Sequence, residues 1–350
     1  MTIGRLVWAV LICFHLWGAE FRRERIFGPE VPTGPYKHPA SITELSNGDL
    51  YLVYYGGGGE YETDTAVYGS RLRKGATWTP PRIIAKDPFR SAGNAVIWQA
   101  PDGLVWLFYV VRFGTTWSDS RIQVKISSDG AETWSDPSLL ALEAGMMVRN
   151  RPIVLANGDY LLPIYHERGH DTEFVGPEST SLFLRYNPGK KEWVQTGRIR
   201  SHNGNIQPAV VEISRNHLLA FCRRGGGYGA GTQGYIVRSE SHDGGWTWSE
   251  GKDSEFPNPN SAIELIRLRS GRLLLVYNAS MTERTPLTTA LSEDNGQTFP
   301  YRRNIVEGPG SFAYPVALQT QDGKIHVVYT SDRRTVIYRV VLDEAWILGN

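Results

Sequence analysis

The stretch Asn47-Gly48-Asp49-Leu50-Tyr51-Leu52-Val53-Tyr54-Tyr55 joins a tight turn to a run of β-forming residues. An Asn-Gly step supplies the positive φ angles that a two-residue hairpin loop requires. The same combination of turn and strand returns five more times along the 350-residue chain. The six turns are Asn47-Gly48-Asp49, Asp102-Gly103, Asn157-Gly158-Asp159, Arg215-Asn216, Ser270-Gly271 and Asp322-Gly323.

The spacing of these turns is nearly constant. Counted from positions 48, 103, 158, 216, 271 and 323, the steps are 55, 55, 58, 55 and 52 residues. A strand-built repeat of roughly 50 residues is typical of a β-propeller blade. The sequence therefore predicts an all-β fold, a six-bladed β-propeller. Because the repeat occupies nearly the whole chain, we expect a single domain over residues 20–350.

A second repeat precedes each turn and marks the innermost strand of each blade. Proline is tolerated there because the first residue of a strand need not donate a ladder hydrogen bond. The last blade is short of one strand, so we expect the N-terminal segment near Arg25–Phe27 to close the ring, which removes an exposed sheet edge. The strand starts are His38-Pro39-Ala40, Asn94-Ala95-Val96, Arg151-Pro152-Ile153, Gln207-Pro208-Ala209, Ser261-Ala262-Ile263 and Tyr314-Pro315-Val316.

A third repeat has the pattern S-x-D-x-G-x-T followed by Trp or Phe. It occurs at Ser241–Trp248 and Ser292–Phe299, and Ser127–Trp134 matches with Ala131 in place of glycine. The aspartate of such a turn can accept backbone N–H bonds, and the glycine allows a left-handed residue. We therefore interpret this pattern as structural.

Composition and the N-terminus limit the partners and the location. A net charge of +1 argues against nucleic acid or a membrane surface as partner. Met1–Ala19 has a basic start and an apolar stretch, which is typical of a signal peptide and predicts a secreted or periplasmic monomer without membrane insertion; a buried N-terminal strand is the alternative. After cleavage Cys222 is the one cysteine, so we expect no intrachain disulfide, and we predict neither a metal nor a cofactor.

The propeller geometry sends polar residues to one face. The start of each innermost strand and the end of the next strand lie on the same face, around the axis. Polar loops are common in any fold, but the enrichment in arginine favours a cationic pocket, because arginine pairs with carboxylate or sulfate through two parallel bonds. Candidate ligand-binding residues are Lys37, His38, Arg149, Arg151, His166, Gln207, Arg223, Asn260 and Arg284.

These features resemble the sialidase superfamily, six-bladed propellers with Asp-box repeats, over roughly residues 25–342. The detail is similar to the bacterial predicted-neuraminidase group, in strings such as Arg149-Asn150-Arg151-Pro152, Ile206-Gln207-Pro208 and Pro257–Ser261. The resemblance implies an exo-acting, retaining glycoside hydrolase that releases sialic acid or a related acidic sugar from a glycan. Such enzymes use a tyrosine nucleophile, a glutamate that activates it, an aspartate acid/base and three arginines.

The resemblance assigns catalytic roles residue by residue. Tyr314 matches the nucleophile, Glu212 the activating glutamate and Asp64 the acid/base. Arg223 and Arg284 match two of the arginines. At the first arginine the chain has Tyr36-Lys37-His38-Pro39, and a lysine is a point charge that cannot make the planar fork.

Several alternatives stay open from the residues themselves. Tyr314 could be a core tyrosine, and His166 a hydrogen-bonded loop histidine. Glu60 or Glu62 could replace Asp64, and Arg224 competes with Arg223. A carboxylate among aliphatic residues needs a partner, which favours a functional role for Glu212.

The hydrolase hypothesis depends on one contact. A neutral phenol gains nucleophilicity when Glu212 takes its proton, so the Tyr314 hydroxyl must lie within hydrogen-bond reach of that carboxylate. A second hypothesis is a lyase on a uronate polysaccharide, with His166 or His202 and Tyr314 as base and acid. A third is a lectin-like propeller that binds anionic glycans without turnover. Fold alone does not separate the three.

Overall fold

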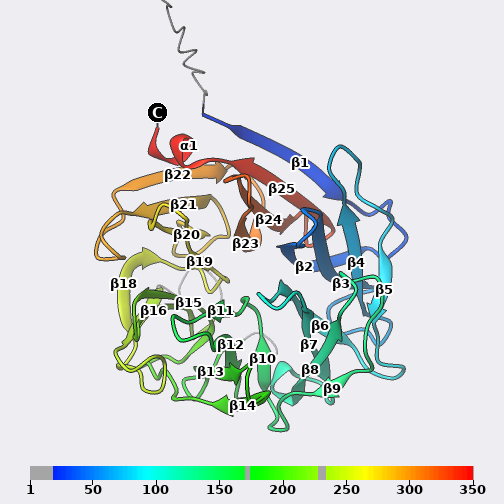
Figure 1. Cartoon of the computed structure of the whole chain (residues 1–350), viewed down its shortest axis with the longest axis horizontal. Helices are drawn as coiled ribbons and strands as arrows, with labels where there is room; N and C mark the ends of the chain where they lie inside the picture. Colours follow the sequence, from blue (N-terminus) through cyan, green and yellow to red (C-terminus); the bar gives the residue numbers. More distant parts are fainter. Residues whose placement is uncertain (1–18, 170–173, 228–233, 350) are drawn as a thin grey trace, which may run out of the picture.

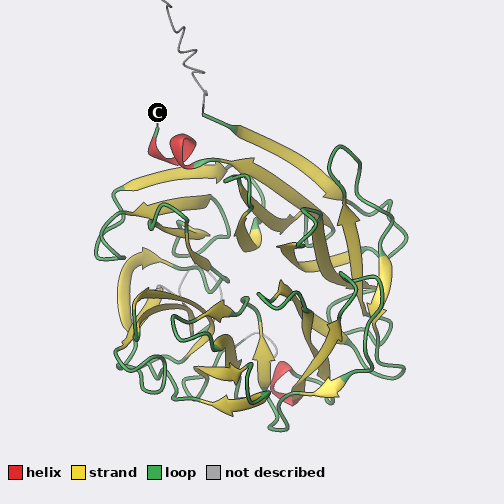
Figure 2. Cartoon of the chain, viewed as in Figure 1, coloured by secondary structure: helices red, strands yellow, loops and turns green. Residues whose placement is uncertain are grey.

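The computed structural model describes residues 19–169, 174–227 and 234–349. In these residues five sheets of four strands and one of five surround a central axis (Figure 1). Strands dominate, and the helical segments are short (Figure 2). The six-bladed propeller is confirmed. The predicted signal peptide lies outside the described residues except for Ala19, and no described helix has the length and apolarity to cross a membrane.

Each blade is an antiparallel meander that starts near the axis and ends at the rim. Blade I contains β2 (Tyr36–Glu44), β3 (Leu50–Gly57), β4 (Ala66–Leu72) and β5 (Arg82–Ala85). Blade II contains β6 (Ala92–Gln99), β7 (Val105–Arg112), β8 (Ser120–Ser127) and β9 (Ser138–Leu139). Blade III contains β10 (Met146–Val148), β11 (Ile153–Val154), β12 (Tyr160–His166), β13 (Thr180–Asn187) and β14 (Glu192–Gln195).

The remaining blades follow the same order. Blade IV contains β15 (Asn205–Ser214), β16 (His217–Arg224), β17 (Tyr235–Ser241) and β18 (Lys252–Pro257). Blade V contains β19 (Glu264–Arg267), β20 (Leu273–Asn278), β21 (Leu287–Ser292) and β22 (Tyr301–Val306). Blade VI contains β23 (Ala313–Gln319), β24 (Ile325–Ser331), β25 (Val336–Leu342) and the N-terminal strand β1 (Phe21–Phe27).

The N-terminal strand closes the ring, as the sequence predicts. Strand β1 pairs antiparallel with β25, from Phe21 opposite Leu342 to Phe27 opposite Ile337 (Figure 1). The strand is longer than the predicted Arg25–Phe27. The chain then ends in the short helix α1 (Glu344–Leu348), which the sequence reasoning did not anticipate and whose Trp346 stacks on Phe21 at 4.6 Å.

The hydrophobic core consists of one cluster between each pair of neighbouring blades. Val96 and Phe108 of blade II pack with Leu162 of blade III, for example. Leu161 of blade III packs with Leu218 of blade IV in the next cluster. Clusters of the same kind join blades I and II, IV and V, V and VI, and VI and I. Each blade therefore buries both of its faces, which explains why its central strands are apolar without alternation.

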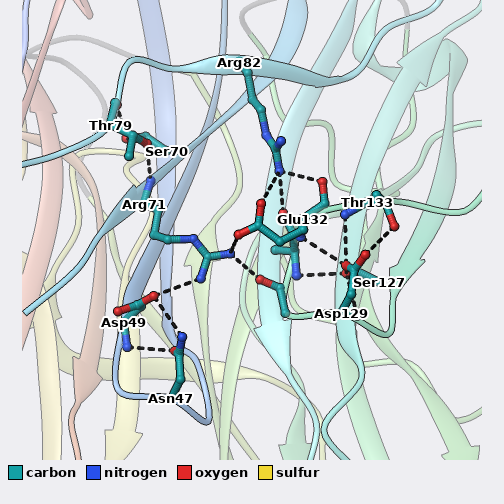
Figure 3. A network of polar contacts seen from close by, with 12 residues as sticks. Asn47, Asp49, Ser70, Arg71, Thr79, Arg82, Ser127, Asp129, Glu132 and Thr133 are labelled. Atoms are coloured by element: carbon teal, nitrogen blue, oxygen red, sulfur yellow. Dashed lines mark hydrogen bonds and ion pairs between the residues drawn. The ribbon is translucent and has the colours of Figure 1, made fainter.

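Arginines also link three of the blades to the S-x-D-x-G-x-T turn of the blade that follows. Arg71 of β4 pairs with Asp49 (Figure 3), with 3.0 Å between the two groups, and also donates to the carbonyl of Gly130 in blade II. Arg185 of β13 donates in the same way to Gly244 at 3.1 Å, and Arg238 of β17 to Gly296 at 2.5 Å.

The turns that receive these arginines are held from within by their aspartates. Asp129 accepts hydrogen bonds from Ser127, from the backbone of Glu132 and from Thr133 (Figure 3). Asp243 accepts from Ser241 and Thr247, and Asp294 from Ser292 and Thr298. These aspartates therefore stabilise the rim.

Candidate functional site at the mouth of the propeller

Four residues at the starts of innermost strands adopt left-handed backbone angles. They are Asn94, Gln207, Asn260 and Tyr314, with φ of 45, 53, 55 and 56°. Ladder irregularities flank three of these positions, between Gly93 and Val96, Ile206 and Ala209, and Ala313 and Val316. A large side chain at positive φ is strained, and such strain clusters at functional sites.

Arg223, the penultimate residue of β16, collects three of these four side chains. Its Nε donates to the Asn260 side-chain oxygen at 2.7 Å. Its Nη1 donates to the Tyr314 hydroxyl at 2.8 Å and to the Gln207 side-chain oxygen at 3.2 Å. The fourth residue, Asn94, donates to the hydroxyl of Tyr165 at 2.9 Å. The strained starts of four blades thus converge on the axis.

Tyr314 differs electrostatically from the other buried tyrosines at this mouth. Burial raises the pKa of Tyr55 and of Tyr165 well above the ordinary value. Burial also raises the pKa of Tyr314, but Arg223 and further arginines outweigh it, so its pKa lies below the ordinary value. The Tyr314 phenol is therefore the one among these three that is biased toward phenolate.

Two further arginines, besides Arg223, lower the pKa of Tyr314. The Arg284 guanidinium lies 5.5 Å from the centre of the Tyr314 ring and donates to the Asn260 carbonyl at 3.2 Å. Arg334 also lowers the pKa of Tyr314 and pairs with the carboxylate of Glu60. Arg334 ends a turn in which three consecutive non-glycine residues, 332–334, have positive φ, a conformation that L-residues rarely sustain.

The ring of Tyr314 is supported from its sides. His38 makes an edge contact with it at 4.3 Å, and the His38 Nδ1 lies 2.7 Å from the Thr330 hydroxyl. Arg149 donates from Nη2 to the Tyr314 carbonyl at 2.7 Å, with its guanidinium 5.2 Å from the ring centre. Burial, with the nearby arginines, holds the pKa of His38 well below its usual range, so this histidine is neutral.

Glu167 supplies a second titratable group in the same pocket. Burial raises its pKa to about 7, against the opposing effect of Arg223. A carboxyl group with this pKa can exist in either protonation state near neutral pH, which suits a proton donor that later acts as a base. Tyr314, Arg223 and Glu167 line one pocket together with Glu60 and Arg334.

This pocket is small and polar. Its volume is 30 Å³, room for about two water-sized groups such as the oxygens of a carboxylate. The aromatic side chains of Tyr61, Trp117 and Phe174 add to its wall. In the described part of the chain, no three histidine, cysteine or acidic side chains at this mouth lie close enough to hold a metal ion.

The structure corrects the assignment of Glu212. This residue lies five positions after Gln207 along β15, which puts it roughly 16 Å further down the strand. Its carboxylate accepts the backbone N–H of Asn216 at 3.0 Å and of Ala156 at 2.6 Å, both at hairpins on the opposite face. The contact of Tyr314 with Glu212 on which the hydrolase hypothesis depends is absent. The partner that a carboxylate among aliphatic residues needs is a pair of backbone amides.

Asp64 and Lys37 also turn away from the pocket. Asp64 is exposed, and both of its oxygens accept the Gly58 N–H at 3.0 Å, because the carboxylate caps its own loop. Lys37 donates from Nζ to the Gly34 carbonyl at 2.6 Å. Two neighbouring residues reach the site instead. Glu60 comes from the loop that contains Asp64, and His38 follows Lys37 in β2.

Arg151 and His166 lie outside the pocket as well. Arg151 donates to the Ala317 carbonyl and lines a separate cavity of 390 Å³ on the hairpin side of the axis. His166 lies 3.0 Å from Arg198 through Nδ1 and faces Glu143. Because successive side chains of an extended segment point to opposite sides, it is Glu167, not His166, that enters the pocket.

Seven of the residues predicted from the sequence meet at the mouth, and other residues there were not predicted. Tyr314, His38, Arg149, Gln207, Arg223, Asn260 and Arg284 are brought together. The residues predicted from the sequence omit Glu167, Tyr165 and Arg334, and include Glu60 only as an alternative to Asp64. The alternation of side-chain direction after β12 could have favoured Glu167 over His166. The left-handed turn that carries Arg334 contains no glycine, so the sequence gives no signal for it.

Comparisons with known proteins agree with this fold. The model of the BNR repeat-like domain family matches residues 48–327. A comparison with curated proteins gave no significant match.

Solved structures with the same architecture include a Hadza microbial sialidase, Hz136, with a TM-score of 0.77 and 15% identity over 93% of this chain and 69% of that one. A protein of unknown function from Dyadobacter fermentans has a TM-score of 0.75 and 17% identity over 92% and 99%. The intramolecular trans-sialidase from Ruminococcus gnavus has a TM-score of 0.73 and 13% identity over 92% and 97%. At these identities the likeness concerns the fold.

Proposed function

This chain belongs to the BNR repeat-like domain family, and on that premise we propose that its mouth binds the acidic terminal sugar of a glycan and releases it by hydrolysis with retention of configuration. The observation that carries the proposal is Tyr314, a buried phenol whose pKa is lowered by arginines of three different blades. The same guanidinium groups can pair with a substrate carboxylate. The small polar pocket suits that carboxylate.

In this mechanism the arginines take the activating role that the resemblance assigns to a glutamate. The Tyr314 oxygen attacks the anomeric carbon while the bond between that carbon and the glycosidic oxygen of the leaving group breaks. Glu167 gives its proton to that oxygen. A water molecule, deprotonated by the Glu167 carboxylate, then displaces Tyr314 from the sugar, and the phenolate is restored. Two inversions at the anomeric carbon give net retention.

An anionic nucleophile beside a substrate carboxylate would ordinarily be repelled. Here Arg223, Arg284 and Arg334 offset both negative charges, and the positioned guanidinium groups cost no reorganisation during the reaction. His38 and Arg149 act on the orientation of the phenol. The N-terminal sequence of residues 1–19 adds to this proposal a location outside the cytoplasm.

A lyase on a uronate glycan is the second candidate, and one observation favours it. The Tyr314 hydroxyl is held by a guanidinium rather than by a carboxylate. A phenolate so stabilised could remove the proton beside a uronate carboxylate. The bond to the neighbouring glycosidic oxygen then breaks, and that oxygen takes up the proton that Tyr314 has received. His166 and His202 have no part in this version, because neither lines the pocket.

Product analysis separates the candidates. The full chain is incubated with sialylated, Kdn-bearing and uronate-bearing glycans, and the products are identified by mass spectrometry. The hydrolase adds water and releases a free acidic sugar, and a fluorinated sugar analogue becomes attached to the peptide that carries Tyr314. The lyase gives an unsaturated product that absorbs in the ultraviolet. Glycan binding without any product would refute both and support a binding propeller.

A further inference from the structure

Three side chains with metal-binding atoms share one face of blade IV, near the hairpin end of its strands. Strands β16 and β17 pair antiparallel, with Leu218 opposite Ser241 and Leu219 opposite Glu240. Continuing this register puts His217 opposite His242. Because side chains alternate along a strand, Glu240 shares the face of His242. We call His217, Glu240 and His242 the blade IV histidine cluster.

The cluster is compact. The His217 Nε2 lies 2.8 Å from a Glu240 carboxylate oxygen, and the two imidazole rings are 4.2 Å apart at their centres. One ligand atom from each residue lies within 4.8 Å of the others. His217 and Glu240 are half-buried, whereas His242 is exposed. The rings and the carboxylate are therefore held together by strand pairing, with one side open to solvent.

Arg238 fixes the orientation of the carboxylate. It donates from Nη2 to the other Glu240 oxygen at 2.8 Å, which leaves the first oxygen directed at His217. Carboxylates that bind metals are commonly held by such a donor. The positive charge of Arg238 also weakens the attraction for a cation, so we expect the site to rely on its imidazoles.

From this geometry we propose that the blade IV histidine cluster binds a divalent first-row transition-metal ion, with Zn²⁺ as the best fit. Two imidazoles and one carboxylate are a ligand set that zinc accepts, with a solvent molecule as the fourth ligand. Zinc bonds of about 2.0–2.1 Å put tetrahedral ligand atoms about 3.3 Å apart. The present separations require the side chains to close by roughly 1.5 Å at most. Calcium and magnesium prefer oxygen ligands and fit poorly.

The ion would act on the joint between two blades. Arg238, which holds Glu240, also donates to the Gly296 carbonyl of blade V at 2.5 Å. A metal bound only by the folded cluster stabilises the folded state by mass action. The role we infer is thus structural and independent of the chemistry at the mouth.

The test uses the chelator-treated full chain and zinc chloride. Calorimetric titration should show one ion per chain. The thermal midpoint should rise by about 3–6 °C at saturating zinc and stay unchanged with calcium chloride. Absence of binding at micromolar zinc would overturn the proposal.

Variants test the assignment of the ligands. His217→Ala and His242→Ala should each weaken zinc binding at least tenfold, and the double variant should abolish it. His202→Ala removes an exposed histidine outside the cluster and should bind zinc as the original chain does. Each variant must match the original far-ultraviolet circular dichroism in the absence of zinc. His242→Ala is the decisive one if His217→Ala fails to fold, because His242 is exposed. Zinc binding that persists in a folded His242→Ala chain, or that is lost in His202→Ala, contradicts the proposal.

Discussion

The two ends of the innermost strands differ in backbone strain and in the hydrogen-bond partners of their polar side chains. At the mouth, four of them begin with a strained residue at positive φ, and those side chains converge on Arg223 and Tyr165. At the opposite end, a polar side chain near the end of four of these strands accepts a backbone N–H from the hairpin of the preceding blade. These pairs are Glu44 with Gln321, Gln99 with Ser46, Glu212 with Ala156, and Gln319 with Arg269.

The hairpin end of the strands holds the blades together, whereas the mouth is where we propose the chemistry takes place. At the hairpin end, backbone-to-side-chain hydrogen bonds join neighbouring blades. At the mouth, backbone strain, buried arginines and tyrosines are tolerated because the rest of the blade is over-determined. We therefore expect polar residues at the hairpin end to contribute to stability, and polar residues at the mouth to bind the proposed ligand.

The strongest test removes the hydroxyl at the mouth. Tyr314→Phe should lower kcat by about 10³-fold or more, because the nucleophile is lost while the ring packing stays. The measurement is the rate at which product is released from the glycan that the original chain cleaves. Tyr301→Phe, a hydroxyl that contacts Glu293 at the rim, should keep its activity. Normal turnover by Tyr314→Phe would contradict the proposed role of Tyr314 as nucleophile.

The proton donor is tested by pH. Glu167 donates only when protonated, and its pKa is raised to about 7, so kcat should fall as pH rises through about 7. Glu167→Gln should lower kcat by roughly 10²–10³-fold and abolish this decline. Glu143→Gln, a carboxylate beside His166 outside the pocket, is the control. An unchanged pH profile in Glu167→Gln would exclude the role.

Arginine geometry can be compared at the two ends directly. Arg223→Lys keeps the charge but loses the fork that holds Asn260 and Tyr314 together, so kcat/KM should fall about 10–100-fold. Arg267→Lys at the hairpin end, where the guanidinium donates to the carbonyls of Glu212 and Ile213 at 2.9 Å, should leave kcat/KM within twofold. Equal losses from the two variants would erase the distinction between the ends.

The smallest effect is expected at Glu212. Glu212→Ala should lower the free energy of unfolding by about 1 kcal/mol, because two backbone amides lose their acceptor near the surface. Urea denaturation measures this, and Glu212→Gln should recover part of it. Turnover per folded molecule should not change. A folded but inactive Glu212→Ala chain would return this residue to the catalytic set.

Local turn chemistry and spacing were enough to predict the blades and the closing strand. Each hairpin and each Pro-containing strand start is a local signal, and their repetition supplies the ring. The same signals brought Tyr314, Gln207 and Asn260 to one face, because strand starts must surround the axis. The short helix α1 has no counterpart in the repeat and was missed for that reason.

The errors at the site come from contacts between blades. Glu212 does satisfy its carboxylate, but with the hairpin of blade III, a partner that no pattern within its own strand reveals. Counting five residues of strand from Gln207 would have excluded it from the mouth. Arg334 replaces Lys37 as the third cation near Tyr314 through a left-handed turn of Asp and Arg residues, for which composition gives no signal.

The pairing of β1 with β25 also has a consequence for biosynthesis. Among the described strands, β1 is made first, yet its hydrogen-bonding partner is made last, since Phe21 pairs with Leu342. At translation rates of about 5–20 residues per second, β1 waits roughly 15–60 s for that partner. Five blades can form in order during translation, but the ring closes only after Leu342 has been made. Until then β1 and the most recently made blade each carry an unpaired strand edge. A chaperone that covers such edges would act in that interval.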